Sequence, residues 1–131
     1  MWPLNPQGEL LVIGLIESRT GHANLERILD ATDGIGVIWP TPGDLAADLG
    51  LIGQLGHPEV EEMVQQALDV CTRRGVPCAA GAHSTEEAVR RAEQGFGIVL
   101  APPEPGLAAA VRGARLAGRA MPTEIPGTQR L

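Results

Sequence analysis

The sequence contains no lysine, so all ten of its basic residues are arginines. The absence of lysine excludes Schiff-base catalysis and a Walker-type phosphate site, because both depend on a lysine amine. Acidic residues outnumber basic ones by 16 to 10, which gives a formal net charge of −6 and a pI of about 4.9. We therefore expect no nucleic acid and no membrane as partners, since their negative charge attracts basic proteins.

Aromatic residues, cysteines and long apolar runs are also scarce. The aromatic residues are two tryptophans and one phenylalanine, so Leu, Ile, Val and Ala must build the core. Cys71 and Cys78 are expected to be buried free thiols rather than a disulfide, because nothing else in the sequence indicates an oxidising compartment. The longest apolar run, residues 10–16, is too short to cross a bilayer, and the first residues lack a signal-peptide pattern. These features predict a cytoplasmic protein.

The apolar residues that are present alternate between strand and helix patterns. Continuous apolar runs are typical of strands buried on both faces of a parallel sheet, and spacings of three and four residues are typical of amphipathic helices. We predict strands over residues 10–16, 35–39, 76–80 and 97–101, and helices over residues 21–32, 58–74, 85–94 and 107–116. The sequence therefore predicts an α/β fold with four βα units and a parallel sheet. Residues 1–9 are expected to be a lead-in, residues 10–118 the domain and residues 119–131 a flexible tail.

Local signals support several of these boundaries. Ser84 and Glu87 have the spacing of a capping box at the start of a helix. Pro58 suits a first helical turn, and the glutamates after it, residues 59–62, are expected to be a solvated first turn. The Gly- and Pro-rich segment that includes residues 41–44 is predicted to be a loop.

Two carboxylates follow predicted strands, at the edge where functional groups collect in parallel βα folds. Glu17 is the first polar residue after the first strand, and Asp44 lies four residues beyond the Pro40 that ends the second. If these strands are neighbours, the two hard oxygen ligands suit Mg²⁺ or Mn²⁺. The alternative is that Glu17 caps the following helix and Asp44 forms an Asx-type turn. The histidines, His22, His57 and His83, are expected at the surface or at helix caps rather than as ligands.

Four segments carry a more specific signal: Leu15-Ile16-Glu17-Ser18, Pro42-x-Asp44-Leu45, Asp48-Leu49-Gly50 and Gly56-His57-Pro58-Glu59-Val60. In this order, and with Asp44 27 positions after Glu17, they resemble the HpcH/HpaI aldolase and citrate lyase family. The resemblance covers residues 8–118. The loop Thr41-Pro42-Gly43-Asp44-Leu45-Ala46 departs from the family pattern, because a small residue is replaced by Thr41 and a hydroxyl is lost at Ala46.

The resemblance implies the C-terminal half of a (β/α)₈ TIM barrel and a metal-dependent aldolase or lyase. Such an enzyme cleaves a carbon–carbon bond to give pyruvate or a related 2-oxo acid, and a divalent metal, Mg²⁺ or Mn²⁺, stabilises the enolate. Glu17 and Asp44 would bind the metal, and the backbone around Gly43 and Asp44 would bind the substrate carboxylate. A metal-stabilised enolate agrees with a chain that has no lysine for a Schiff base.

The resemblance also implies that catalytic groups are missing. The catalytic arginine of the family and its His/Asp acid-base pair lie ahead of the metal-binding glutamate, in a half-barrel that these residues do not include. We therefore expect the chain to be truncated, and inactive or weakly active alone, and to associate with itself or with a complementary N-terminal half-barrel. Two alternatives stay open, a non-catalytic metal-binding or interaction module and a small flavodoxin-like α/β binding domain.

Overall fold

The computed structural model describes residues 11–100, and the predictions for residues 1–10 and 101–131, including a helix over 107–116, lie outside this part. The elements, in chain order, are β1 (Val12–Ile16), α1 (Arg19–Ala23), α2 (Leu25–Ala31), β2 (Ile35–Pro40), α3 (Pro42–Asp48), α4 (Pro58–Arg74), β3 (Ala79–Gly81), α5 (Thr85–Gln94) and β4 (Ile98–Leu100). All strand pairs are parallel, as predicted. The described residues therefore form an α/β fold, and the fourth βα unit stays a prediction.

The strands follow the order β1-β2-β3-β4 across the fold. β1 pairs with β2, and β3 pairs with β4. A single parallel bridge between Ile38 and Cys78, with the Ile38 N–H donating to the Pro77 carbonyl at 3.0 Å, joins the two pairs. Pro77 has no N–H to donate, and the third strand begins at Ala79 rather than at the predicted residue 76. The carboxyl ends of β2 and β3 thus lie at the same edge.

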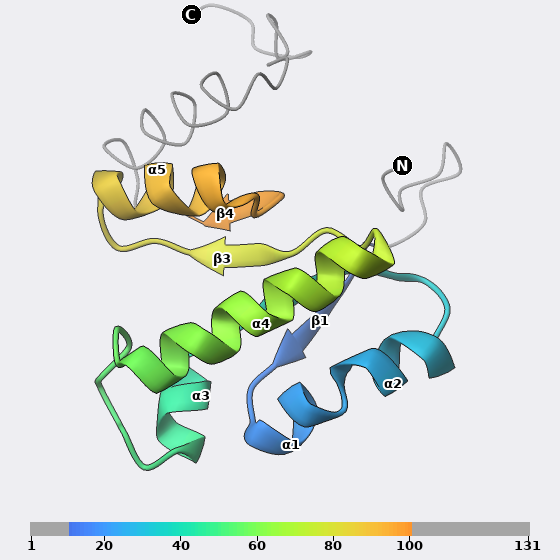
Figure 1. Ribbon diagram of the computed structural model, residues 1–131, viewed down its shortest axis with the longest axis horizontal. Helices are drawn as coiled ribbons and strands as arrows, with labels where there is room; N and C mark the ends of the chain where they lie inside the picture. Colours follow the sequence, from blue (N-terminus) through green and yellow to red (C-terminus); the bar gives the residue numbers. More distant parts are fainter. Residues whose placement is uncertain (1–10, 101–131) are drawn as a thin grey trace, which may run out of the picture.

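Most of the core lies between the sheet and α4. Figure 1 shows this long helix passing in front of β1, with α2 on one side of it and β3 and α5 on the other. One face of α4 is buried, through residues such as Val60, Val64 and Leu68. They pack in one cluster with Ile16 and Ile38 of the strands. The aliphatic core expected from the composition is present, together with one aromatic side chain, Phe96.

Two buried cysteines belong to this core. Cys71 of α4 and Cys78 before β3 are both free. A hydrogen bond with Cys71 and burial in the apolar core raise the pKa of Cys78. A protonated, buried thiol is a poor nucleophile, so Cys78 acts as a core residue rather than as a reactive group.

The predicted helix over residues 21–32 is instead two helices, α1 and α2. The helix is interrupted at Asn24, which is the C-cap of α1 and the N-cap of α2. The Asn24 side chain donates a hydrogen bond to the Thr20 carbonyl at 2.8 Å. A side-chain bond to the local backbone offers an alternative to the helical ladder, and this competition explains the break. The first helix begins earlier than predicted because the Ser18 hydroxyl accepts from the Gly21 N–H at 3.1 Å.

The predicted loop at residues 41–44 is also wrong, because these residues begin helix α3. Pro42 occupies the first turn, where its missing N–H costs nothing and its φ is already helical. Leu45 and Ala46 are fully buried, so tertiary packing stabilises a helix that the Gly and Pro content argued against. This correction matters for function, since it places Asp44 in the first turn of a helix.

Candidate functional site

A cavity of about 780 Å³ lies at the carboxyl ends of β2 and β3. Trp39 and Thr41 line it from the end of β2, and Gly81 and His83 line it from the end of β3. Open α/β folds bind ligands at this edge, so the cavity is the candidate site.

Gly43 and Asp44, two of the predicted site residues, lie in the wall of this cavity. Both belong to the first turn of α3. The first helical hydrogen bond runs from the Leu45 N–H to the Thr41 carbonyl at 3.0 Å, so the N–H groups of Gly43 and Asp44 precede it and have no partner within the helix. Free N–H groups at a helix N-terminus favour a negatively charged ligand.

Glu17, the other predicted metal ligand, follows β1 directly and is exposed. The Thr41 N–H donates to the Ile16 carbonyl at 3.1 Å, and this bond joins the end of β1 to the start of the segment that carries Asp44. Glu17 does not line the cavity as Asp44 does. The structure therefore brings the two segments together at one edge but places only Asp44 in the cavity wall. The alternative roles do not fit either residue: Ser18, not Glu17, caps α1, and Asp44 is helical.

The carboxylates at this edge suit a hard divalent cation whose remaining ligands are water or substrate oxygens. Within residues 11–100 the structure contains no group of three or more His, Cys, Asp or Glu side chains that could hold a metal ion. Glu17 and Asp44 supply two carboxylates at the ends of the neighbouring strands β1 and β2, and Mg²⁺ commonly binds one or two carboxylates with water and substrate oxygens. The residues thus fit such a cation by chemistry, with its other positions left to water or substrate.

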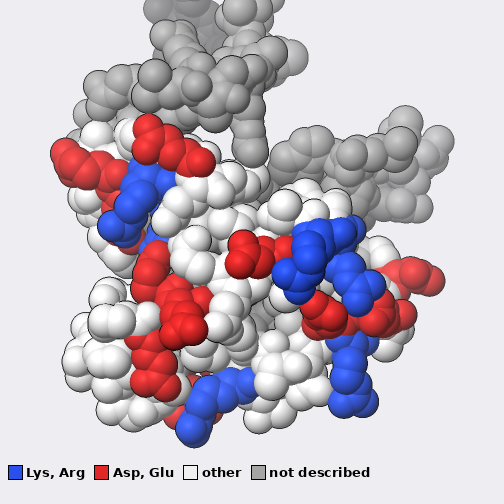
Figure 2. Space-filling model, in the orientation of Figure 1, with Lys and Arg blue, Asp and Glu red and all other residues white. Residues whose placement is uncertain are grey.

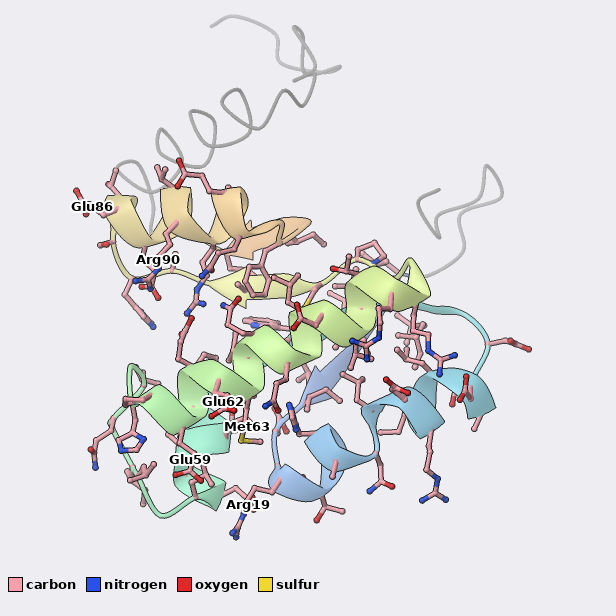
Figure 3. The ribbon with its side chains drawn as sticks, viewed as in Figure 1. Arg19, Glu59, Glu62, Met63, Glu86 and Arg90 are labelled. Carbon is pink, nitrogen blue, oxygen red and sulfur yellow. The ribbon has the colours of Figure 1, made fainter. Side chains whose placement is uncertain are left out.

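Arg19 connects this edge to α3 rather than facing the cavity. Its backbone N–H donates to Asp48 Oδ2 at 2.9 Å and its Nε donates to the same oxygen at 3.0 Å. The bond from the backbone N–H, followed by the bond from the side chain, lowers the pKa of Asp48. In Figure 3 the Arg19 side chain projects outward from α1.

The three histidines occupy different structural positions. His57 is the N-cap of α4, where Nδ1 accepts from the Glu59 N–H at 3.3 Å, as the capping interpretation predicted. His22 Nε2 lies 3.0 Å from the Met63 carbonyl and connects α1 to α4. His83 lines the cavity at the end of β3, and its backbone N–H donates to Glu87 Oε2 at 2.8 Å. Of the three, His83 is the one placed to meet a ligand.

A buried arginine with two hydrogen bonds to one carboxylate lies in the cavity wall and was not anticipated from the sequence. Arg91 of α5 is a buried arginine, 3% exposed, and it binds both carboxylate oxygens of Glu61, at 2.5 Å and 2.7 Å. It also lies 5.6 Å from the centre of the Phe96 ring, within range of a cation–π interaction. The hydrogen bond from Arg91, the largest cause, lowers the pKa of Glu61.

Glu61 therefore departs from the expected solvated first turn. Glu59 and Glu62 are exposed, and Figure 3 shows them on the side of α4 next to α3, away from α5. Figure 3 also shows Arg90 on the side of α5 that faces α4. The spacing along the helix could have distinguished Glu61 from Glu59 and Glu62. Residues three positions apart lie on the same face of a helix, so Glu61 lies beside the buried Val64.

Figure 2 shows acidic and basic side chains beside one another on the face that it draws, together with a run of acidic side chains on the left. Arg73 binds Glu26 at 2.6 Å and Arg74 binds Asp30 at 2.5 Å, which ties the end of α4 to α2. These exposed pairs contribute little to stability but leave the arginines paired.

No helix in residues 11–100 is long and apolar enough to cross a membrane.

Residues 5–99 match the HpcH/HpaI aldolase/citrate lyase family, and the chain belongs to this family. The fold is correspondingly similar to a solved HpcH/HpaI family protein from Burkholderia cenocepacia, with a TM-score of 0.66 and 33% identity. That comparison covers 85% of this chain and 43% of the other. The HpcH/HpaI aldolase of Desulfitobacterium hafniense gives a TM-score of 0.66 at 26% identity, over 93% of this chain and 46% of its own.

Among curated relatives, the hydroxypyruvate/pyruvate aldolase of Chromohalobacter salexigens is 37% identical over 91 residues. The 5-keto-4-deoxy-D-glucarate aldolase of Klebsiella pneumoniae is 38% identical over 84 residues. The matches span 70% and 64% of this chain but only 35% and 32% of these relatives. The family resemblance is thus confirmed and favours an aldolase or lyase origin over a flavodoxin-like domain, and the chain spans about a third of the curated relatives.

Proposed function

We propose that these residues form part of a lyase site that cleaves a carbon–carbon bond to release pyruvate or a related 2-oxo acid. The observation that carries the proposal is the position of Gly43 and Asp44, in the wall of a cavity at the carboxyl ends of β2 and β3, in a chain of the HpcH/HpaI family. The relatives' names support a 2-oxo acid, since one is a hydroxypyruvate/pyruvate aldolase and another a 5-keto-4-deoxy-D-glucarate aldolase.

Each predicted residue has a role in this proposal. Glu17 and Asp44 would hold Mg²⁺ or Mn²⁺, which when bound would polarise the keto oxygen of the substrate. The N–H groups of Gly43 and Asp44 precede the first hydrogen bond of α3 and bind the substrate carboxylate, with support from the positive end of the helix. The buried Trp39 Nε1 has no hydrogen-bond partner among the described residues, so a substrate oxygen in the cavity could satisfy this donor.

The proposal assigns no acid-base pair to this chain. In the family the catalytic arginine and the His/Asp pair are expected ahead of the metal-binding glutamate, outside residues 11–100. The 131-residue chain by itself is therefore proposed to be inactive or weakly active, a binding half of the site. The cytoplasm is the proposed location, because two buried free cysteines suit a reducing compartment.

Metal titration tests the binding half directly. We expect Mg²⁺ or Mn²⁺ to raise the melting temperature of the chain, since a ligand at about 100 times its Kd stabilises a protein by about 2.7 kcal/mol. Glu17→Gln and Asp44→Asn should abolish the rise while leaving the metal-free melting temperature nearly unchanged, because both side chains are exposed. Differential scanning calorimetry with and without metal makes this measurement.

Asp33→Asn is the matched control, because Asp33 is an exposed carboxylate before β2, at the opposite end of the strand from Asp44. It should keep the full metal response. A parent chain that shows no metal response, or one that Asp33→Asn weakens as much as Asp44→Asn does, contradicts the assignment. A second assay measures release of pyruvate from 2-oxo acid aldol substrates. If metal raises the melting temperature but no pyruvate is released, even after a complementary N-terminal half-barrel is added, the non-catalytic metal-binding alternative is favoured.

A further inference from the structure

The candidate cavity has room for more than a three-carbon 2-oxo acid. Its volume of about 780 Å³ is typical of pockets that hold drug-sized ligands, and pyruvate is far smaller than these. Gly43 and Asp44 form one part of its wall, and Glu87 and Arg91 of α5 form another. A substrate whose carboxylate binds at Gly43 and Asp44 can therefore extend toward α5.

Two buried N–H groups of the cavity wall have no hydrogen-bond partner among residues 11–100. They are Trp39 Nε1 and Arg91 Nε. Arg91 is 3% exposed, and its other two nitrogens bind the carboxylate of Glu61. A buried donor without an acceptor is destabilising, so buried polar groups normally have a partner. An oxygen atom of a ligand in the cavity would be an acceptor for these donors.

The charges in this part of the wall disfavour a second carboxylate. The residues that α4 and α5 contribute include three carboxylates, Glu61, Glu86 and Glu87, and two arginines. Arg91 binds Glu61, and Arg90 lies 3.6 Å from Glu87, so each arginine already faces a carboxylate. Like charges brought together in a binding site select against the wrong ligand. A neutral hydroxyl group therefore fits this part of the cavity better than an anion does.

The first turn of α5 offers an anion little compensation. Free N–H groups at a helix N-terminus normally attract anions. Here the Ser84 hydroxyl accepts from the Glu87 N–H at 3.1 Å, and the Glu87 carboxylate accepts from the His83 N–H at 2.8 Å. The chain's own groups thus bind these donors, and Glu86 and Glu87 already place negative charge in this turn. Figure 3 shows Glu86 at the start of α5.

The far part of the cavity bears on the second product of the cleavage, and the inference rests on the proposed function. When an aldol of a 2-oxo acid is cleaved, the bond between carbons 3 and 4 breaks. The hydroxyl on carbon 4 loses its proton and becomes the aldehyde carbonyl, and carbon 3 takes the electron pair and then a proton. We propose that the aldehyde portion is neutral and polyhydroxylated, with hydroxyl oxygens that accept from Trp39 Nε1 and Arg91 Nε, and that the site disfavours an aldehyde bearing a carboxylate.

Calorimetric titration of the full chain with saturating Mg²⁺ tests this preference. The ligands are pyruvate, 2-keto-3-deoxy-D-gluconate and 5-keto-4-deoxy-D-glucarate. The two longer ligands have the same carbon chain and differ at the far end, which is a hydroxymethyl group in the gluconate and a carboxylate in the glucarate. We expect the gluconate to bind about tenfold more tightly than either of the others, a difference of about 1.4 kcal/mol.

Pyruvate separates this inference from the proposed function. If pyruvate binds but the gluconate binds no more tightly, the inference is overturned and the proposed function stands. Binding of the glucarate as tight as that of the gluconate has the same meaning. If none of the three ligands binds, the proposed function fails and the inference fails with it.

Glu86→Gln tests the contribution of charge. Glu86 is exposed, so the substitution should preserve the fold. It should reduce the preference for the gluconate over the glucarate by about threefold or more, because it removes a negative charge from the wall. Glu93→Gln is the matched control, since Glu93 is exposed on the same helix but does not line the cavity. Equal preferences in the two variants overturn the proposal.

The indole of Trp39 reports on the donor itself. The chain has two tryptophans, so Trp2→Phe leaves Trp39 as the single indole. In this variant, labelled with ¹⁵N, the gluconate should shift the Trp39 Nε1–H resonance more than pyruvate does, because the indole donor gains an acceptor. A resonance that moves no further with the gluconate than with pyruvate overturns the proposal.

Discussion

At the scale of single residues, the ion pair between Glu61 and Arg91 joins α4 to α5 in the cavity wall. Arg91 is 3% exposed, and its main partner is a glutamate 31% exposed. Burying a guanidinium is costly unless it is paired and hydrogen-bonded. Glu87 Oε1, at 3.5 Å, and Gln94 add only weaker contacts. Glu61 therefore supplies most of the compensation for the burial of Arg91.

Removing the charge of Glu61 should destabilise the fold. We expect Glu61→Gln to lower the free energy of unfolding by about 1–3 kcal/mol at pH 7, because it leaves a buried arginine short of its charged partner. Urea unfolding measures the effect. Glu62→Gln is the control: Glu62 is exposed and accepts a hydrogen bond from Gln66 Nε2 at 3.0 Å, so its change should stay within about 0.5 kcal/mol. Equal effects of the two substitutions would show that the ion pair does not stabilise the wall.

At the scale of helices and strands, caps decide where the elements begin. The Ser84 hydroxyl accepts from the Glu87 N–H at 3.1 Å, which confirms the predicted capping interaction. The Glu87 carboxylate returns to the His83 N–H instead of the Ser84 N–H that the capping box predicts. The cap thus also fixes the residue that lines the cavity at the end of β3.

Loss of this cap should be measurable. Ser84→Ala should cost about 1 kcal/mol, the typical loss of an N-cap side chain. Ser84→Asp should retain the stability of the parent, because aspartate caps helices equally well and adds favourable charge at the first turn. Thermal unfolding monitored by circular dichroism compares the two. An alanine variant as stable as the aspartate variant would argue that α5 is stabilised by packing alone.

At the scale of the whole molecule, each carboxylate whose pKa changes on folding contributes to the pH dependence of the free energy of unfolding. The pKa values of Glu61 and Asp48 are both lowered by arginine partners. A lowered pKa in the folded state means that the ionised group stabilises the fold above its unfolded pKa, and that this contribution is lost as the pH falls through the folded pKa. Both groups therefore favour the folded state at neutral pH and stop doing so in acid.

The pH dependence can be assigned to Glu61 with its own variant. The stability gap between the parent chain and Glu61→Gln should be widest near pH 7 and should shrink as the pH falls below 4.5, the ordinary pKa of the group. Urea midpoints measured from pH 7 to pH 3 for both proteins provide the comparison. A gap that stays constant down to pH 3 would mean that the carboxylate charge is not what stabilises the pair.

The described part of the molecule also has exposed apolar side chains on β1. The helices of residues 11–100 cover the face of the sheet that contains Ile16 and Ile38, and β1 ends the sheet with exposed apolar side chains. The solved family structures of similar fold are longer, and this chain covers 43% and 46% of two of them.

The sequence by itself determined the α/β class, the parallel strands, most element positions and the family. These predictions rest on local patterns: apolar runs, helical spacing and the motifs around Glu17, Asp44 and His57. Such patterns can be recognised without knowledge of the fold, because they involve residues that are close together in the sequence. Tertiary structure decided the rest. Packing of Leu45 turned a Gly- and Pro-rich segment into helix α3 and placed Asp44 in the cavity wall. The pairing of Glu61 with Arg91, 30 residues apart, arose only when α4 and α5 came together, because contacts between distant residues leave no periodic trace in the sequence.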